Sequence, residues 1–189
     1  MKIKENLWVA MAVIVIAVIS RLIPHYPNLT ALGAAALFGG AYFYRRFGFL
    51  IPLIALFISD LLLNNLLYAK QFPANYDGFV WLPAQTLWTY GAFILIAVLG
   101  KLIIREGKLM TMIGASLGAS VIFFLITNFA VWLSSPTYPD TIAGLSLAYI
   151  AGIPFFWNTL VGDLFFVAVF FGGYELVKVY LLKKSHAPS

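Results

Sequence analysis

Polar and ionisable side chains occur at a small number of positions inside segments that are otherwise apolar. The acidic members of this set are Asp60 and Asp163, and its amides include Asn64, Asn128 and Asn158. Inside a lipid bilayer such side chains are costly, and they usually face a water-filled cavity, a ligand or a partner helix. If the surrounding segments cross a membrane, these residues predict a binding site.

The chemistry around these residues does not favour catalysis. Asp60 and Asp163 have the right type for an acid/base pair, but the sequence places no nucleophile or metal ligand with them. The chain has no cysteine, and its two histidines are His25 in a Pro-rich loop and His186 in a polar tail. Neither a His-Glu-x-x-His motif nor a glycine-rich phosphate loop is present. We therefore expect a protein that is not an enzyme, without catalytic residues, a resident metal or a cofactor.

The composition of the chain is that of a membrane protein. Its 189 residues are 62% hydrophobic and 10% charged, whereas a soluble domain carries about 25% charged residues. A spanning helix needs about 20 apolar residues. We expect an all-α, polytopic bundle that forms one domain over residues 1–189. Its six transmembrane helices are predicted at about 7–23, 29–44, 47–69, 80–100, 109–133 and 154–181.

The basic residues predict how the bundle is oriented. With both termini in the cytoplasm, ten of the 12 Lys and Arg residues fall on the cytoplasmic side, and only Arg21 and Lys70 fall outside. These ten are Lys2, Lys4, Arg45, Arg46, Lys101, Arg105, Lys108, Lys178, Lys183 and Lys184. Cytoplasmic loops are enriched in Lys and Arg, so the net charge of +5 indicates membrane orientation, and no nucleic-acid partner is expected.

In this orientation the polar positions gather in the outer half of the membrane. Counted at 1.5 Å per residue, Asp60 lies about 20 Å from the inner end of its span, and Asp163 lies about 14 Å below the outer surface. We therefore predict a polar cavity that opens outward. The outer connection 134–154 contains Asp140, a suitable N-cap for a short interfacial helix over 141–150. This connection is either an ordinary linker or a lid.

Each polar residue also has a structural interpretation. Asp60 is suited to an ion pair with Arg21, and the asparagines to hydrogen bonds between helices. Asp163 has no evident basic partner in the sequence. Small residues at four-residue spacing mark close helix contacts or a surface for docking a partner, and they occur as two pairs: Gly114 with Gly118 and Ala31 with Ala35.

The stretches Phe57–Asp60, Thr127–Trp132 and Asn158–Leu164 resemble those of an uncharacterised family of small bacterial six-span membrane proteins associated with transport. More broadly, the chain is similar to the substrate-binding S components of ECF-type vitamin transporters. The resemblance implies a bacterial cytoplasmic (inner) membrane protein that binds a vitamin-like molecule or a metal ion from outside. It also implies docking to a transmembrane coupling subunit driven by ATPases.

Carried onto this sequence, the resemblance implies a pocket built from acids, amides and tryptophans. Its residues are Asp60, Asn64, Asn128, Asn158 and Asp163, with Trp81, Trp132 and Trp157 as stacking or lid residues. The chain departs from S components in one respect, because the Ala-xxx-Ala docking pattern falls on Ala31 and Ala35 of the second span instead of the first. The alternative function is a non-transporting protein that assembles with or stabilises a larger membrane complex.

Overall fold

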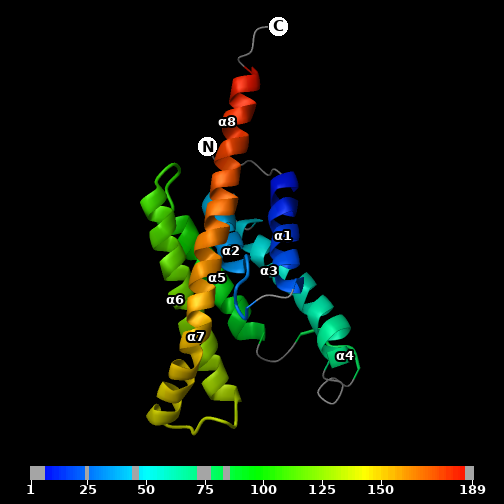
Figure 1. Ribbon diagram of the computed structural model, residues 1–189, viewed down its shortest axis with the longest axis vertical. Helices are drawn as coiled ribbons and strands as arrows, with labels where there is room; N and C mark the ends of the chain where they lie inside the picture. Colours follow the sequence, from blue (N-terminus) through cyan, green and yellow to red (C-terminus); the bar gives the residue numbers. More distant parts are fainter. Residues whose placement is uncertain (1–6, 24–25, 44–46, 72–77, 83–85, 186–189) are drawn as a thin grey trace.

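The structure is a computed structural model that describes residues 7–23, 26–43, 47–71, 78–82 and 86–185, with side chains as far as Val179. The described chain is built from helices (Figure 1), which confirms the all-α prediction. The helices are α1 (Leu7–Leu22), α2 (Leu32–Tyr42), α3 (Phe47–Leu62), η1 (Leu63–Tyr68), α4 (Ala69–Gln71), α5 (Thr86–Ile103), α6 (Leu109–Ser134), α7 (Ile142–Val167), η3 (Ala168–Gly172) and α8 (Gly173–Ser185). The two elements η1 and η3 are π-helices.

Four helical stretches of the described chain are long and apolar enough to cross a membrane: Phe47–Gln71, Thr86–Ile103, Leu109–Ser134 and Ile142–Val179. Two further apolar helices, Leu7–Leu22 and Leu32–Tyr42, are shorter. Many large apolar side chains are exposed on the outside of the bundle, as expected for a surface that contacts lipid. The predicted six spans are thus four long apolar helices and two short ones.

The predicted second span, 29–44, is longer than the helix that forms. Helix α2 has 11 residues, which at 1.5 Å per residue is about 16 Å, roughly half of the hydrocarbon thickness. Leu29 and Thr30 belong instead to a turn, next to Asn28 with its positive φ of 66°. Every residue of α2 except Ala41 is buried. The helix is apolar on all sides because other helices surround it.

Small residues allow the backbone of α2 to touch its neighbour α5. A Cβ atom added to Gly40 would lie 1.8 Å from the carbonyl oxygen of Ala97, and one added to Gly100 would lie 2.4 Å from the carbonyl oxygen of Leu37. Both distances are far below van der Waals contact. The core of the bundle therefore depends on glycine at these positions, and a side chain would separate the two helices.

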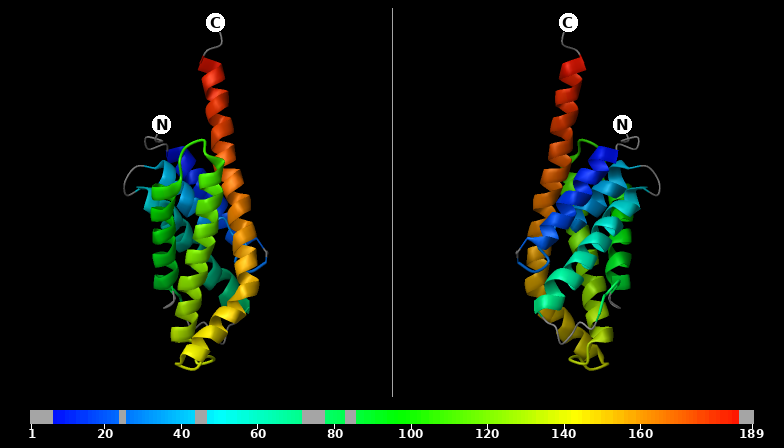
Figure 2. Two further views of the ribbon diagram at one scale, coloured as in Figure 1. Left: turned by 90° about the vertical axis from the view of Figure 1, so that its left-hand side faces the viewer. Right: turned by 90° about the vertical axis from the view of Figure 1, so that its right-hand side faces the viewer.

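The helix that contains the last predicted span, 154–181, begins earlier in the chain than predicted. Helix α7 starts at Ile142, continues through Pro154, and is followed without a break by η3 and α8. Thr141, not Asp140, caps it: the Thr141 Oγ1 accepts a hydrogen bond from the Gly144 N–H at 3.1 Å. A proline removes only one helical hydrogen bond, so the helix bends but persists, and its lower part changes direction in Figure 2.

The helices run back and forth between two ends of the molecule. Helix α1 begins and α8 ends toward the end that carries the turn between α5 and α6, whereas the turn between α6 and α7 lies at the opposite end (Figure 2). The turn between α1 and α2 lies midway between the two ends, because both helices are short.

The end with the α5–α6 turn carries Lys101, Arg105 and Lys108. Glu106 in this turn forms an ion pair with Lys178 of α8, and hydrogen bonding from that lysine lowers the pKa of the Glu106 carboxyl. Other basic residues of the predicted cytoplasmic set, Lys2, Lys4, Arg45 and Arg46, lie outside the described residues, and so does His25.

Candidate functional site

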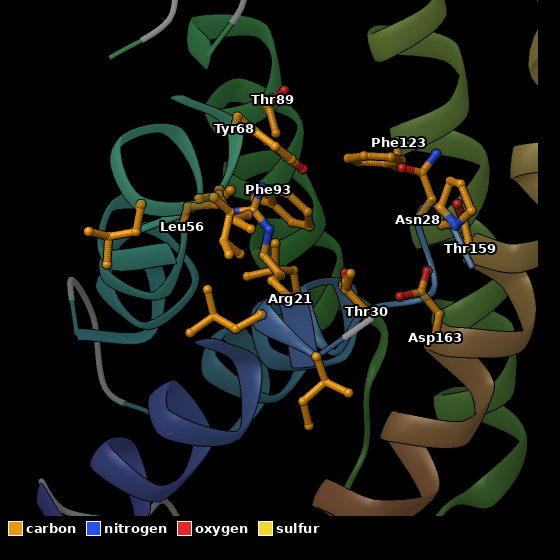
Figure 3. A pocket seen from close by; sticks show the side chains of 18 of the residues that line it. Arg21, Asn28, Thr30, Leu56, Tyr68, Thr89, Phe93, Phe123, Thr159 and Asp163 are labelled. Carbon is orange, nitrogen blue, oxygen red and sulfur yellow. The ribbon is translucent and has the colours of Figure 1, made fainter. Parts of the chain in front are cut away.

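A partly open cavity of about 850 Å³ lies beside the α1–α2 turn and is lined by residues from α1, α2, α3, η1, α4, α5, α6 and α7. Its volume is within the range of small-molecule sites. Its apolar wall includes Leu56, Phe93 and Phe123 (Figure 3). The polar and charged residues of the lining are Arg21, Asn28, Thr30, Tyr68, Lys70, Gln71, Thr89, Thr159 and Asp163.

Asp163 is the acidic residue of this lining. Its residue surface is 2% exposed, and its Oδ2 accepts a hydrogen bond of 2.7 Å from the Ser120 hydroxyl of α6. Its Oδ1 lies 2.0 Å from the position that a Cβ of Gly33 would occupy. The carboxylate is therefore pressed against the first turn of α2, where the helix dipole favours negative charge.

Arg21 supplies a positive charge on the opposite side of the cavity from Asp163, with Thr30 between them (Figure 3). Its Nη1 donates to Asp60 Oδ1 at 2.6 Å and to Ser59 Oγ at 2.5 Å. The side chains of Arg21 and Asp60 are 20% and 13% exposed. Asp60 thus forms the ion pair that the sequence offered as its structural interpretation, and it supports Arg21 from behind the cavity wall.

Two predicted site residues lie near the cavity without lining it. Asn158 Nδ2 donates a hydrogen bond of 3.0 Å to the carbonyl oxygen of Pro27, a residue of the cavity lining. Asn158 therefore holds the α1–α2 turn in place. Asn64 is buried within η1, but it is not among the residues that line the cavity.

Asn128 packs between helices, but the hydrogen bond of its side chain stays within its own helix instead of crossing to another. Its side chain donates to the carbonyl oxygen of Phe124 at 2.8 Å, one turn earlier in α6. Its Oδ1 would be 2.3 Å from a Cβ on Gly152. Asn128 therefore fills the contact between α6 and α7, and it does not line the cavity.

The three tryptophans assigned to stacking or lid roles also lie outside the cavity lining. Trp132 Nε1 donates to the carbonyl oxygen of Pro139 at 2.9 Å, which closes the turn between α6 and α7. Trp157 is 59% exposed and Trp81 is 66% exposed. Exposed indole rings of this kind are common where a membrane protein meets the headgroup region.

Arg21 and Lys70, which line the cavity, were absent from the predicted pocket. Both residues could have been identified from the sequence, because they are the two basic residues that the predicted orientation places on the outer side of the membrane. Tyr68 and the wall formed by Phe93 and Phe123 carried no such signal. Aromatic residues are frequent throughout this chain, at 17% of all residues.

The π-helix η1 forms one wall of the cavity through Leu63, Leu66, Leu67 and Tyr68. Asn65 ties this element to the following loop: its Nδ2 donates to the Val80 carbonyl oxygen at 2.9 Å and its Oδ1 accepts from the Val80 N–H at 2.8 Å. Short π-helical segments are often found at functional sites.

The two small-residue pairs differ in their burial and in the contacts that surround them. Ala31 and Ala35 are fully buried in the core. Gly118 contacts Leu99, since its added Cβ would lie 3.0 Å from a methyl carbon, whereas Gly114 is exposed and nothing lies within 4 Å of its added Cβ. Of the four, Gly114 alone leaves room for a partner.

The chain belongs to a family of unknown function (DUF6580), whose family model matches residues 1–186. No curated protein and no solved structure matches the chain.

Proposed function

We propose that this member of the family is a membrane transporter or substrate-binding subunit that takes up a small molecule across the bacterial inner membrane. The observation that carries the proposal is the cavity of about 850 Å³ with Arg21 and Asp163 on opposite sides. Buried charged groups in a membrane bundle are costly unless they serve a ligand, an ion or a partner. Here they line a space of suitable size.

The distribution of basic residues supports uptake from outside. On the basis of the positive-inside bias we assign both termini to the cytoplasm. The elements η1 and α4 then lie toward the outer side, and the α1–α2 turn lies about midway. Lys70 and Gln71, at the end of α4, are exposed and line the cavity. The ligand would enter past them.

An organic ligand suits the lining better than a metal ion. Within the described residues no group of three or more His, Cys, Asp or Glu side chains gathers, and the cavity lining offers one carboxylate. The resemblance to S components suggests a coupling subunit with ATPases as a partner. Of the small-residue positions, the exposed Gly114 on α6 is the one open to such contact.

The test is ligand capture by the purified protein. The full chain in mild detergent would be dialysed against a bacterial metabolite extract, and bound compounds would be identified by mass spectrometry. Thermal unfolding would then be repeated with each candidate, since a ligand of the folded state raises the apparent stability. A compound that stabilises the wild type but not Asp163→Asn supports the proposal.

A null result would favour the alternative, in which the protein assembles with a larger membrane complex. In that case Gly114→Leu would disrupt co-purification of the partner, and Asp163→Asn would not. The two functions are separated because Gly114 and Asp163 lie on different surfaces, one exposed and one in the cavity.

A further inference from the structure

We infer, on the basis of the proposed function, that the substrate is a zwitterion: a small organic molecule with a cationic amine and an acidic group at separate positions. The amine would bind at Asp163 and the acidic group at Arg21 and Lys70. The cavity lining supplies charges of both signs, and Figure 3 shows Asp163 and Arg21 on opposite sides of the space.

Asp163 is suited to recognise an amine. Its carboxylate oxygens accept one side-chain hydrogen bond, from Ser120, and no basic side chain pairs with it within the described residues. An ionised carboxylate accepts up to about four hydrogen bonds. A ligand ammonium group could therefore satisfy acceptor positions that the protein leaves open, in a site where an unpaired charge is costly.

Arg21 is suited to recognise an acidic group without losing its structural role. Both hydrogen bonds that it makes with described side chains leave from Nη1. A guanidinium group has five N–H donors, so Nη2 and Nε keep donors for a carboxylate or phosphate. Asp60 neutralises part of the charge and fixes the direction of the side chain.

Lys70 adds a second positive charge. It is exposed, it lines the cavity, and it makes no ion pair within the described part of the chain. An exposed lysine near a binding site mainly attracts the opposite charge and speeds association. We expect Lys70 to act on the acidic end of the ligand as it enters.

The space between the charges favours an apolar or aromatic body. Phe93 and Phe123 both line the cavity, and their ring centroids are 5.3 Å apart at an interplanar angle of 40°. In Figure 3 the rings of Phe93 and Phe123 lie between the sides that carry Arg21 and Asp163, whereas Leu56 lies beyond Arg21. A ligand with a positive charge alone would leave the remaining donors of Arg21 unused, and a ligand with a negative charge alone would leave Asp163 without a cationic partner.

The experiment uses matched compounds that differ in charge. Binding of 4-(aminomethyl)phenylacetate, which carries its amine and its acid at opposite ends of an aromatic ring, would be compared with 4-methylbenzylamine, which lacks the acid, and 4-methylphenylacetate, which lacks the amine. Thermal shift and isothermal titration would measure the binding. Compounds enriched by dialysis of the metabolite extract would be sorted in the same way, by whether they carry an amine, an acid or both.

The inference predicts that the bound compounds carry both groups, and that removing either group weakens binding by at least about tenfold. Asp163→Asn should bind compounds with and without the amine equally well. Asp140→Asn, in an exposed turn, is the matched control and should bind as the wild type does. Lys70→Gln should slow association and reduce its salt dependence, with Lys101→Gln as its control.

The outcomes separate this inference from the function on which it rests. Enriched compounds that lack an amine, or that bind Asp163→Asn as well as the wild type, would overturn the zwitterion while leaving a binding protein. No enrichment and no shift with any compound would overturn both. If Asp163→Asn fails to fold, the comparison of amine with deaminated compound on the wild type still decides.

Discussion

Replacement of Gly33 by alanine tests whether Asp163 really lies against the first turn of α2. A Cβ at this position would be 2.0 Å from Oδ1, 2.7 Å from Cγ and 2.9 Å from Oδ2 of Asp163. The carboxylate cannot easily move aside, because Ser120 holds it and its residue surface is 2% exposed. The added methyl must therefore displace either α2 or the side chain of Asp163.

The expected size of the effect follows from two opposing terms. Alanine in place of glycine favours a helix by about 0.5–1 kcal/mol, whereas overpacking a close-packed interior costs about 1–3 kcal/mol. We expect Gly33→Ala to be destabilised by about 1–2 kcal/mol, which for a chain of this size lowers Tm by roughly 2–8 °C. Ligand binding should weaken as well, because the carboxylate is displaced.

Thermal unfolding in detergent measures this effect, and two further variants make it specific. Gly91→Ala in α5 is the control, since nothing lies within 4 Å of its added Cβ; it should be neutral or slightly stabilised. In the double variant Gly33→Ala/Asp163→Ala the clashing atoms are gone, so alanine at position 33 should no longer destabilise. If Gly33→Ala unfolds at the same temperature as Gly91→Ala, the reasoning about Asp163 is wrong.

Three other outcomes are expected. Gly40→Ala should destabilise the bundle by more than Gly33→Ala, because its Cβ would lie 1.8 Å from a backbone carbonyl oxygen of α5, and a backbone atom cannot rotate away as a side chain can. The Tm of this variant should be the lower of the two. A Tm equal to that of the wild type would contradict the α2–α5 contact. Asp60→Asn should cost about 1.5–3 kcal/mol, because it removes the negative charge that neutralises Arg21 although the amide oxygen can still accept a hydrogen bond. Asp60→Asn/Arg21→Gln should recover part of the loss, and an equally unstable double variant argues against the ion pair. Lys178 lowers the pKa of Glu106, so this pair stabilises the folded state at neutral pH and its contribution disappears as the pH falls through the lowered pKa. The difference in Tm between wild type and Glu106→Gln should therefore shrink in acid, and a constant difference would show that the pair does not titrate.

Much of the fold followed from local patterns in the sequence. Apolar runs of sufficient length predicted the helices that begin near Leu7, Phe47 and Leu109, because lipid leaves a helix as the simplest way to satisfy backbone hydrogen bonds. Prediction was weakest where tertiary contacts override local signals. Pro154 read as a helix start but lies inside α7, and the apolar run 29–44 gave a helix of only 11 residues.

The sequence by itself determined which side chains were too polar for lipid. Asp163 was identified in this way, because it is an ionisable residue inside an apolar segment and has no evident basic partner in the sequence. The sequence did not determine which of these polar residues share a cavity. Helices α6 and α7 turn Asn128 toward Gly152, whereas the short α1 and α2 bring Arg21 into the same space as Asp163. Which face of a helix meets which neighbour depends on packing between segments far apart in the chain, and so only the tertiary structure decided it.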